Sequence, residues 1–307
     1  MFLKRQLIVF ALFLLCVSSI SGPAQPPVGC QRRVTTVNVL DHEGNVITGL
    51  GTTAFRAESG GRPLKVLSNF EANPSRRVVI MVDVSGSTIN TGDLARLLAG
   101  SLATSERKFR TAVVLFSEQI VASVDFTRPT EDVLNMLTKL PENKGRTALF
   151  DALKYAADLF GPPLPGDSVY LISDGGENRS KAKPGDIENE LLTKGIRIYS
   201  FNLAGNRVFS TEEERQGPAL LKDLASLTGG MALDLEMNSS KASRERVAAK
   251  LQRLYREMTD FYVLQIEPSA EFRKPQRWDL ELLDSQGRKR QDVRLIYPRK
   301  LAPCLSH

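Results

Sequence analysis

Two short apolar runs constrain the fold of this chain most strongly, and each ends in an aspartate. VVIMVD covers residues 78–83 and SVYLISD covers residues 168–174. A strand that is apolar at every position is typical of a parallel sheet whose two faces are both covered. Helical spacing follows the first run, with Leu94, Leu97, Leu98 and Leu102 on one stripe. The alternation of such strands with helices predicts an open, mostly parallel sheet with helices on both faces.

The same alternation continues over residues 76–260, which we predict to be one doubly wound α/β domain. Residues 111–117 and 119–126 form two apolar strands separated by a very short turn, so we expect one antiparallel hairpin at the sheet edge. Further strands are expected at 196–203 and 231–235. Helices are expected at 93–109, 130–140, 147–160, 186–195, 218–230 and 243–258.

Both ends of the chain show β patterns instead. In the N-terminal segment 25–75, VTTVNVL leads into a turn at DHEGN, and the short strands AFRAE and LKVLSNF follow on either side of Gly60 and Gly61. In the C-terminal segment 261–307 the strands are FYVLQIEP, RWDLELLD and DVRLIYP. Because a few short strands cannot bury a core alone, we expect the two segments to pair as a small β-sandwich-like module. The alternative is two separate β appendages.

The first residues, 1–24, are typical of a signal peptide. Lys4 and Arg5 precede an apolar stretch from Gln6 to Val17 that is too short to span a membrane comfortably. Small residues follow, and cleavage after Ser21 or Ala24 fits the pattern. We therefore expect an exported protein of the periplasm, the cell surface or the medium, with no membrane span after cleavage. An uncleaved anchor is the alternative.

Cleavage would leave two cysteines, Cys30 and Cys304, near the two ends of the mature chain. In an oxidising compartment the two can form a disulfide that ties the ends together. Spacing in the sequence does not decide between this disulfide and two free thiols.

Histidine and charge exclude several function classes. The only histidines are His42, in a turn-like stretch, and His307, the last residue, which argues against a Ser-His-Asp triad, a Cys-His pair and a histidine zinc site. The formal net charge is +6, and the basic residues are mixed with acidic ones along the chain. This distribution does not indicate a nucleic-acid-binding surface.

Oxygen-bearing side chains gather at the ends of the two apolar strands. Asp83, Ser85 and Ser87 alternate, so their side chains can face one way. Thr147 begins a predicted helix, and Asp174 ends the second strand. Carboxylate and hydroxyl oxygens suit a hard cation, with Mg²⁺ expected most and Mn²⁺ or Ca²⁺ as alternatives. The simpler alternative is a capped turn, because Asp and Ser favour turns.

The motifs DVSGS, GRTALFDAL and ISDGGEN, in this order, resemble those of the von Willebrand factor type A domain over about residues 76–260. The resemblance implies a metal-ion-dependent adhesion site formed by the five residues just named. It also implies that the metal captures an Asp or Glu side chain of a protein partner. With its β-rich ends, the whole chain resembles exported bacterial proteins that carry such a domain.

Three more residues are candidates for a partner-binding rim around the metal, namely Arg146, Gly175 and Glu177. The guanidinium of Arg146 is suited to binding a carboxylate. The alternative is an ordinary surface arginine in contact with solvent, as most exposed arginines are. The glycine would allow a backbone to approach closely.

Two carboxylates and three neutral hydroxyls would leave a bound cation with net positive character, which favours an acidic ligand. We therefore expect a metal-dependent adhesion or scaffold protein and no enzyme, because no histidine is available as a general base. One alternative is a structural or signalling protein of the cell envelope in which the metal only stabilises loops. The other is a metal-assisted hydrolase.

Overall fold

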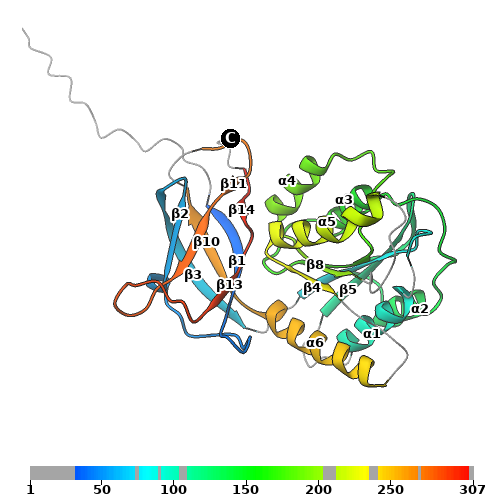
Figure 1. Ribbon diagram of the computed structural model, residues 1–307, viewed down its shortest axis with the longest axis horizontal. Coiled ribbons are helices and arrows are strands. Elements are labelled where there is room, and N and C mark those ends of the chain that lie inside the picture. Colours follow the sequence, from blue (N-terminus) through cyan, green and yellow to red (C-terminus); the bar gives the residue numbers. More distant parts are fainter. Residues whose placement is uncertain are drawn as a thin grey trace, which may run out of the picture.

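The computed structural model describes residues 32–72, 76–88, 91–103, 109–202, 212–234, 241–268 and 271–303. The predicted signal peptide, Cys30 and Cys304 lie outside these ranges. Within them the chain forms an α/β domain and a β module side by side (Figure 1). No helix in the described ranges is long and apolar enough to cross a membrane.

The α/β domain is built on a six-stranded sheet with the order β6-β5-β4-β7-β8-β9. The strands are β4 (Arg76–Asp83), β5 (Phe109–Phe116), β6 (Ile120–Val124), β7 (Ser168–Ser173), β8 (Arg197–Asn202) and β9 (Met231–Asp234). All neighbours are parallel except β5 and β6, which form the antiparallel hairpin at the edge. This arrangement confirms the predicted α/β class and the position of its one antiparallel strand.

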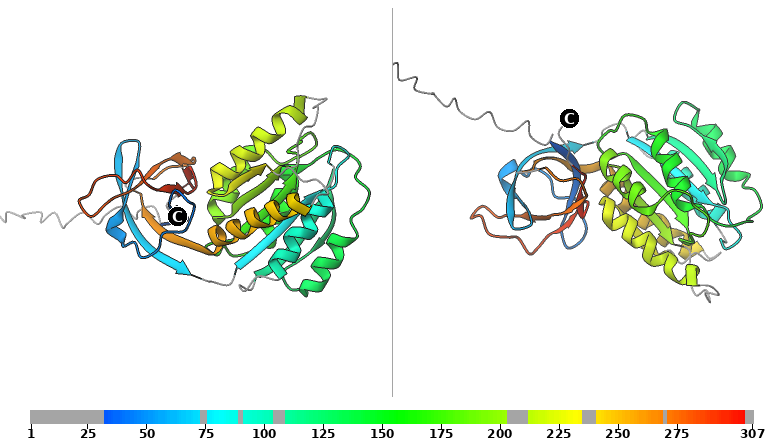
Figure 2. Two further views of the ribbon diagram at one scale, coloured as in Figure 1. Left: turned by 60° about the horizontal axis from the view of Figure 1, so that its bottom comes forward. Right: turned by 90° about the horizontal axis from the view of Figure 1, so that it is seen from above.

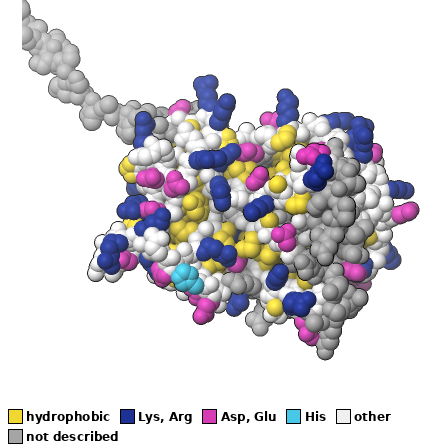
Figure 3. Space-filling model, viewed as in Figure 1, with side chains coloured by type: hydrophobic (Ala, Val, Ile, Leu, Met, Phe, Trp, Pro, Cys, Tyr) yellow, Lys and Arg dark blue, Asp and Glu magenta, His cyan; other side chains and the backbone are white. Residues whose placement is uncertain are grey.

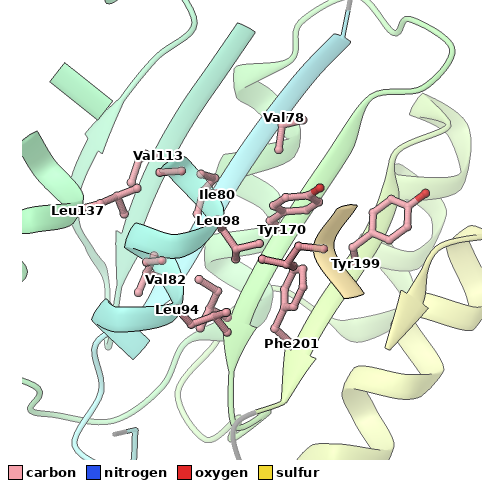
Figure 4. Packing of buried hydrophobic residues seen from close by; sticks show 14 of the residues in the cluster. Val78, Ile80, Val82, Leu94, Leu98, Val113, Leu137, Tyr170, Tyr199 and Phe201 are labelled. Carbon is pink, nitrogen blue, oxygen red and sulfur yellow. The ribbon is translucent and has the colours of Figure 1, made fainter. Parts of the chain in front are cut away.

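Helices cover both faces of this sheet (Figure 2). They are α1 (Thr91–Ala103), α2 (Thr130–Thr138), α3 (Leu149–Leu159), α4 (Pro184–Lys194), α5 (Glu212–Thr228) and α6 (Lys241–Thr259). Val78, Ile80 and Val82 of β4 face the core formed with α1, α2 and α6. Figure 4 shows these side chains with Leu94 and Leu98 of α1 and Leu137 of α2. The alternate residues Val79 and Met81 face the core formed with α3, α4 and α5. A strand with both faces covered is therefore apolar throughout.

Two helix boundaries differ from the prediction by more than two residues. Phe109 belongs to β5 and not to the first helix, whose described part ends at Ala103. The fifth helix begins at Glu212, six residues before the predicted start, so that Pro218 lies inside it. Its first residues, EEERQG, are polar and carry no apolar periodicity, and a proline is more common at a helix start than in its interior.

The β module contains strands from both ends of the chain. Its antiparallel sheet has the order β12-β2-β3-β10-β1-β13, and β11 pairs with β14 separately. The strands are β1 (Arg33–Leu40), β2 (Phe55–Ser59), β3 (Arg62–Ala72), β10 (Asp260–Glu267), β11 (Gln276–Arg277), β12 (Asp279–Leu282), β13 (Arg294–Ile296) and β14 (Lys300–Leu301). Since β10 pairs with both β1 and β3, the α/β domain is inserted between β3 and β10. The sandwich-like packing stays a prediction.

A buried arginine joins the two parts of the molecule. Arg197 of β8 is 1% exposed, and its guanidinium donates to Asn38 Oδ1 of β1 at 3.0 Å and to Met258 O of α6 at 3.1 Å. The guanidinium carbon also lies 4.7 Å from the ring centroid of Phe261 in β10. The end of α6 is therefore fixed to the sheet and to the module at one point.

Candidate metal centre

The sheet order brings the two aspartates to one place. The chain connections run outward in opposite directions from β4 and β7, which are neighbours in the centre of the sheet. Asp83 is the last residue of β4, and Asp174 directly follows β7. Open α/β sheets bind ligands at such a switch point, beyond the carboxyl ends of the strands.

The first loop presents its serines on one side, as the alternation predicted. Ser85 Oγ and Ser87 Oγ lie 3.4 Å apart. Ser85 is fully buried, and its N–H donates to Asp83 Oδ1 at 2.9 Å, while Ser87 is half-buried. Thr88 closes the turn by donating its hydroxyl to Ser85 O at 2.8 Å. The loop is both a capped turn and a cluster of oxygens.

The second and third loops are tied together by backbone hydrogen bonds. Thr147 is 2% exposed; its N–H donates to Asn178 Oδ1 and its carbonyl accepts from Asn178 N–H, both at 3.1 Å. Gly86 N–H donates to Gly145 O, also at 3.1 Å, which links the first loop to the second. The three predicted segments therefore form one rigid unit.

Oxygen atoms from all three loops surround the position of Gly176. A Cβ atom there would lie 3.3 Å from Asp174 Oδ1, 3.6 Å from Thr147 Oγ1 and 3.9 Å from Ser87 Oγ. Gly176 N–H also donates to Asp174 Oδ1 at 3.0 Å. The absence of a side chain at this glycine therefore keeps clear a space lined by three of the predicted ligands.

Asp83 is a carboxyl group without exposure to solvent. Burial raises its pKa to about 6, and the nearby charge of Asp174 contributes in the same direction. Hydrogen bonds from Ser173, at 2.6 Å to Oδ2, and from Ser85 oppose this rise in the pKa. A buried carboxylate of this kind is stabilised by a cation beside it.

The donor set fits a hard divalent cation. The five candidates supply two carboxylates and three hydroxyls, which are oxygen ligands only. Among the described residues there is no cluster of three or more His, Cys, Asp or Glu side chains that could hold a metal, and the candidate set contains only two carboxylates. Asp83, Ser85, Ser87, Thr147 and Asp174 are the residues that would hold Mg²⁺ or a similar ion.

The three rim candidates have different environments. Arg146 is exposed, and its backbone N–H donates to Glu118 Oε1 at 3.1 Å. Gly175 is buried, because its backbone lies against α5. Glu177 is half-buried, and its Oε2 accepts from Phe150 N–H at 3.1 Å, so it caps the start of α3. Partner binding by these residues stays a prediction.

Sequence reasoning did not identify three residues that position the site. Ser173 bonds to Asp83, Asn178 holds the backbone of Thr147, and Gly217 packs on the third loop. Ser173 and Asn178 both belong to the motif ISDGGEN, so their polar side chains within this motif could have indicated that they position the site. Gly217 lies far away in the sequence and gave no such signal.

Residues 78–177 match the family described as the von Willebrand factor type A domain. This match lies within the α/β domain and confirms its predicted resemblance to the von Willebrand factor type A domain. No curated protein matches the chain.

Several solved structures resemble part of the chain. The conserved hypothetical protein BatB from Bacteroides thetaiotaomicron is 13% identical over 59% of this chain and 99% of its own, with a TM-score of 0.40. An aerotolerance-related membrane protein from Bacteroides fragilis NCTC 9343 is 14% identical over 59% and 100%, with a TM-score of 0.39. Proximal thread matrix protein 1 from the mussel byssus is 17% identical over 61% and 49%, with a TM-score of 0.44. Similarities at this level indicate no function for this chain.

Proposed function

We propose that this chain is an exported adhesion or scaffold protein that binds a protein partner through a divalent cation. The observation that carries the proposal is the convergence of Ser87, Thr147 and Asp174 oxygens around the space beside Gly176. The match to the type A domain supports a protein-interaction role. Export rests on the signal-peptide pattern of residues 1–24.

The depth of each ligand suggests its role. Asp83 and Ser85 are fully buried and hydrogen-bonded to each other, so they would fix the inner side of the cation. Ser87 is half-buried and lies nearer the surface. When bound, a cation held by mostly neutral oxygens supplies a positive charge that attracts a carboxylate. A partner side chain, Asp or Glu, would reach the site from this outer side.

A binding role is supported more strongly than hydrolysis. Metal-assisted hydrolysis needs a general base near the metal. His42 lies in the turn that follows β1 of the β module, and Glu177 accepts hydrogen bonds from the backbone at the start of α3 and from Ser180. His42 lies outside the α/β domain, and the Glu177 carboxylate is engaged by these hydrogen bonds, so we propose no catalytic activity.

Affinity capture from native extract tests this function. The bait is the mature chain with Mg²⁺ or with EDTA, Asp174→Ala is the site variant, and Asp125→Ala, in an exposed turn, is the matched control. We expect the wild type and Asp125→Ala to retain a partner in Mg²⁺. We expect no retention by Asp174→Ala, or by any of the three chains in EDTA. Once the partner is identified and purified, replacing its contacting Asp by Asn, or its Glu by Gln, should abolish binding.

Retention of the partner in EDTA with unchanged affinity would contradict the proposal. If Mg²⁺ raised the melting temperature but left the affinity for the partner unchanged, the metal would only stabilise the loops. That result would favour the structural or signalling alternative.

A further inference from the structure

One strand edge in the β module lacks a neighbour. β1 pairs with β10 from Arg33↔Ile266 to Val37↔Tyr262 on one side. On the other side β13 pairs only with the far end of β1, from Asn38↔Ile296 to Leu40↔Arg294. Among the described residues, no strand pairs with residues 33–37 on that second side. Residues 35–37 are buried there, so the part of this edge that is open to another strand lies at Arg33 and Val34.

A cavity of about 270 Å³ runs along this bare edge, between the β module and the α/β domain. Its walls include residues 32–36 of β1, the segment near Leu301, the end of α4 and the loop at Leu164. Figure 3 shows apolar side chains along this junction with charged side chains of both signs around them. We call this cavity the β1 groove.

The β1 groove exposes apolar side chains to solvent. Val34 is 48% exposed and Leu164 is 49% exposed. These are two of the three large apolar side chains that are exposed in the described part of the chain, and both line the groove. Such a concentration at one groove is typical of a binding surface.

The charged residues that line the described part of the β1 groove are all cations. They are Arg32, Arg33, Lys194 and Lys300. Three of these have carboxylate partners beside the groove, namely Glu267, Glu190 and Glu188.

Arg33 differs from the other three cations. Its guanidinium donates to Pro303 O, and its buried Nε has no hydrogen-bond partner among the described residues. Burial lowers the pKa of Arg33, and no carboxylate in the described ranges offsets this effect. Thr35 is 8% exposed, and its buried Oγ1 also has no partner among the described residues. Polar groups of this kind are normally satisfied, so Arg33 and Thr35 have unused hydrogen-bonding capacity beside the groove.

We propose that the β1 groove binds an extended segment of a partner protein, which pairs with the open part of the β1 edge at Arg33 and Val34. Two residues of strand span about 7 Å, so the paired part of the segment is short. Backbone hydrogen bonds would hold the segment, and an Asp or Glu side chain would pair with Arg33. An apolar side chain would cover Val34 and Leu164. This site is separate from the metal centre.

A peptide selection tests the proposal without a known partner. Random ten-residue peptides are displayed and selected on the full mature chain in EDTA, which removes any contribution from the metal centre. Arg33→Gln serves for counter-selection, and Arg56→Gln, an exposed arginine of β2 that pairs with Glu281, is the matched control. Thermal melting of each variant establishes that it is folded.

We expect enriched peptides with an Asp or Glu and an apolar residue. Arg33→Gln should weaken their binding by about tenfold or more, since it removes a charge-assisted hydrogen bond, whereas Arg56→Gln should not. Leu164→Asp, at an exposed position, should weaken it similarly. N-methylation of alternate peptide residues should abolish binding in one register only, because strand pairing uses alternate backbone groups.

Three results would overturn the proposal. The first is that no peptide is enriched over the Arg33→Gln counter-selection. The second is that N-methylation in either register leaves binding unchanged. The third is a dimer of this chain that Leu164→Asp disrupts, which would assign the β1 groove to a second copy.

Discussion

Ser173 donates a hydrogen bond of 2.6 Å to Oδ2 of Asp83, joining the ends of two neighbouring strands below the candidate metal centre. Both residues are fully buried. The same Ser173 Oγ accepts from Gly175 N–H at 2.9 Å, so one hydroxyl connects the first loop to the third. The position of the deepest candidate ligand therefore depends on a residue outside the five-residue motif.

Ser173→Ala should lower both stability and metal affinity. It leaves the buried Gly175 N–H without its acceptor, which costs about 1–3 kcal/mol of unfolding free energy. It also removes a hydrogen bond that lowers the pKa of Asp83, so this pKa should rise above about 6. Urea unfolding and calorimetric Mg²⁺ titration measure the two effects. Ser123→Ala, at an exposed hydroxyl, is the control and should change neither.

The pKa of Asp83 makes metal binding depend on pH. The pKa of Asp83 is raised from 3.8 to about 6 in the folded state. Between these two pH values the Asp83 carboxyl is protonated in the metal-free folded protein and ionised in the unfolded chain. The stability of the metal-free protein should therefore fall as pH rises through this window. Mg²⁺ requires the ionised carboxylate, so its affinity should be about tenfold weaker one unit below the pKa.

Melting curves with and without Mg²⁺ from about pH 5 to about pH 7.5 test this linkage. The rise in melting temperature caused by Mg²⁺ should grow with pH. A rise that is constant over this range, or that persists in Asp83→Asn, would contradict the assignment of Asp83 as a ligand.

Gly176→Ala should block the cation and leave the fold intact. The new methyl group would occupy the space among the oxygens of Ser87, Thr147 and Asp174. The φ of Gly176 is outside the left-handed region, so its backbone accepts an alanine, and the Asp174 carboxylate would shift by a few tenths of an ångström. We expect Mg²⁺ affinity to fall by more than about tenfold with little change in the metal-free melting temperature. Gly185→Ala, which meets open space in α4, is the control for glycine replacement.

Gly175→Ala should be strongly destabilising for a different reason. Gly175 has a φ of +79°, and a Cβ atom there would lie 2.2 Å from the carbonyl oxygen of Gly217 in α5. Gly61→Ala has a similar φ of +72° but meets open space, so it isolates the backbone strain. Urea unfolding should give a loss of about 1 kcal/mol for Gly61→Ala and a loss larger by several kcal/mol for Gly175→Ala. Equal losses would show that α5 moves away without cost.

The sheet could be predicted because the composition of its strands reflects whether their two faces are buried. VVIMVD is apolar at every position, and both of its faces are covered. β1 was harder to interpret, since VTTVNVL reads as alternating while residues 35–40 are all buried. Its polar Asn38 faces Arg197 across the junction of the two parts. A polar residue that is buried by a distant partner cannot be distinguished from an exposed one by its spacing.

The sequence predicted which residues form the candidate metal centre, but it did not predict the contacts that hold these residues in place. Asp83, Ser85 and Ser87 follow from alternation, and sheet order brings Asp174 beside them. The contact of Gly175 with Gly217 depends on the path of α5, which begins in a polar stretch without helical periodicity. Close approaches between segments distant in sequence need the fold before they can be seen.

The most direct test of the central claim is an anomalous difference map at the manganese absorption edge, from crystals of the mature chain soaked in Mn²⁺. We predict one strong peak within coordination distance of oxygens from Ser85, Ser87 and Asp174, and no such peak in Gly176→Ala crystals soaked in the same way. A map of the wild-type protein without a peak among these oxygens would contradict the account.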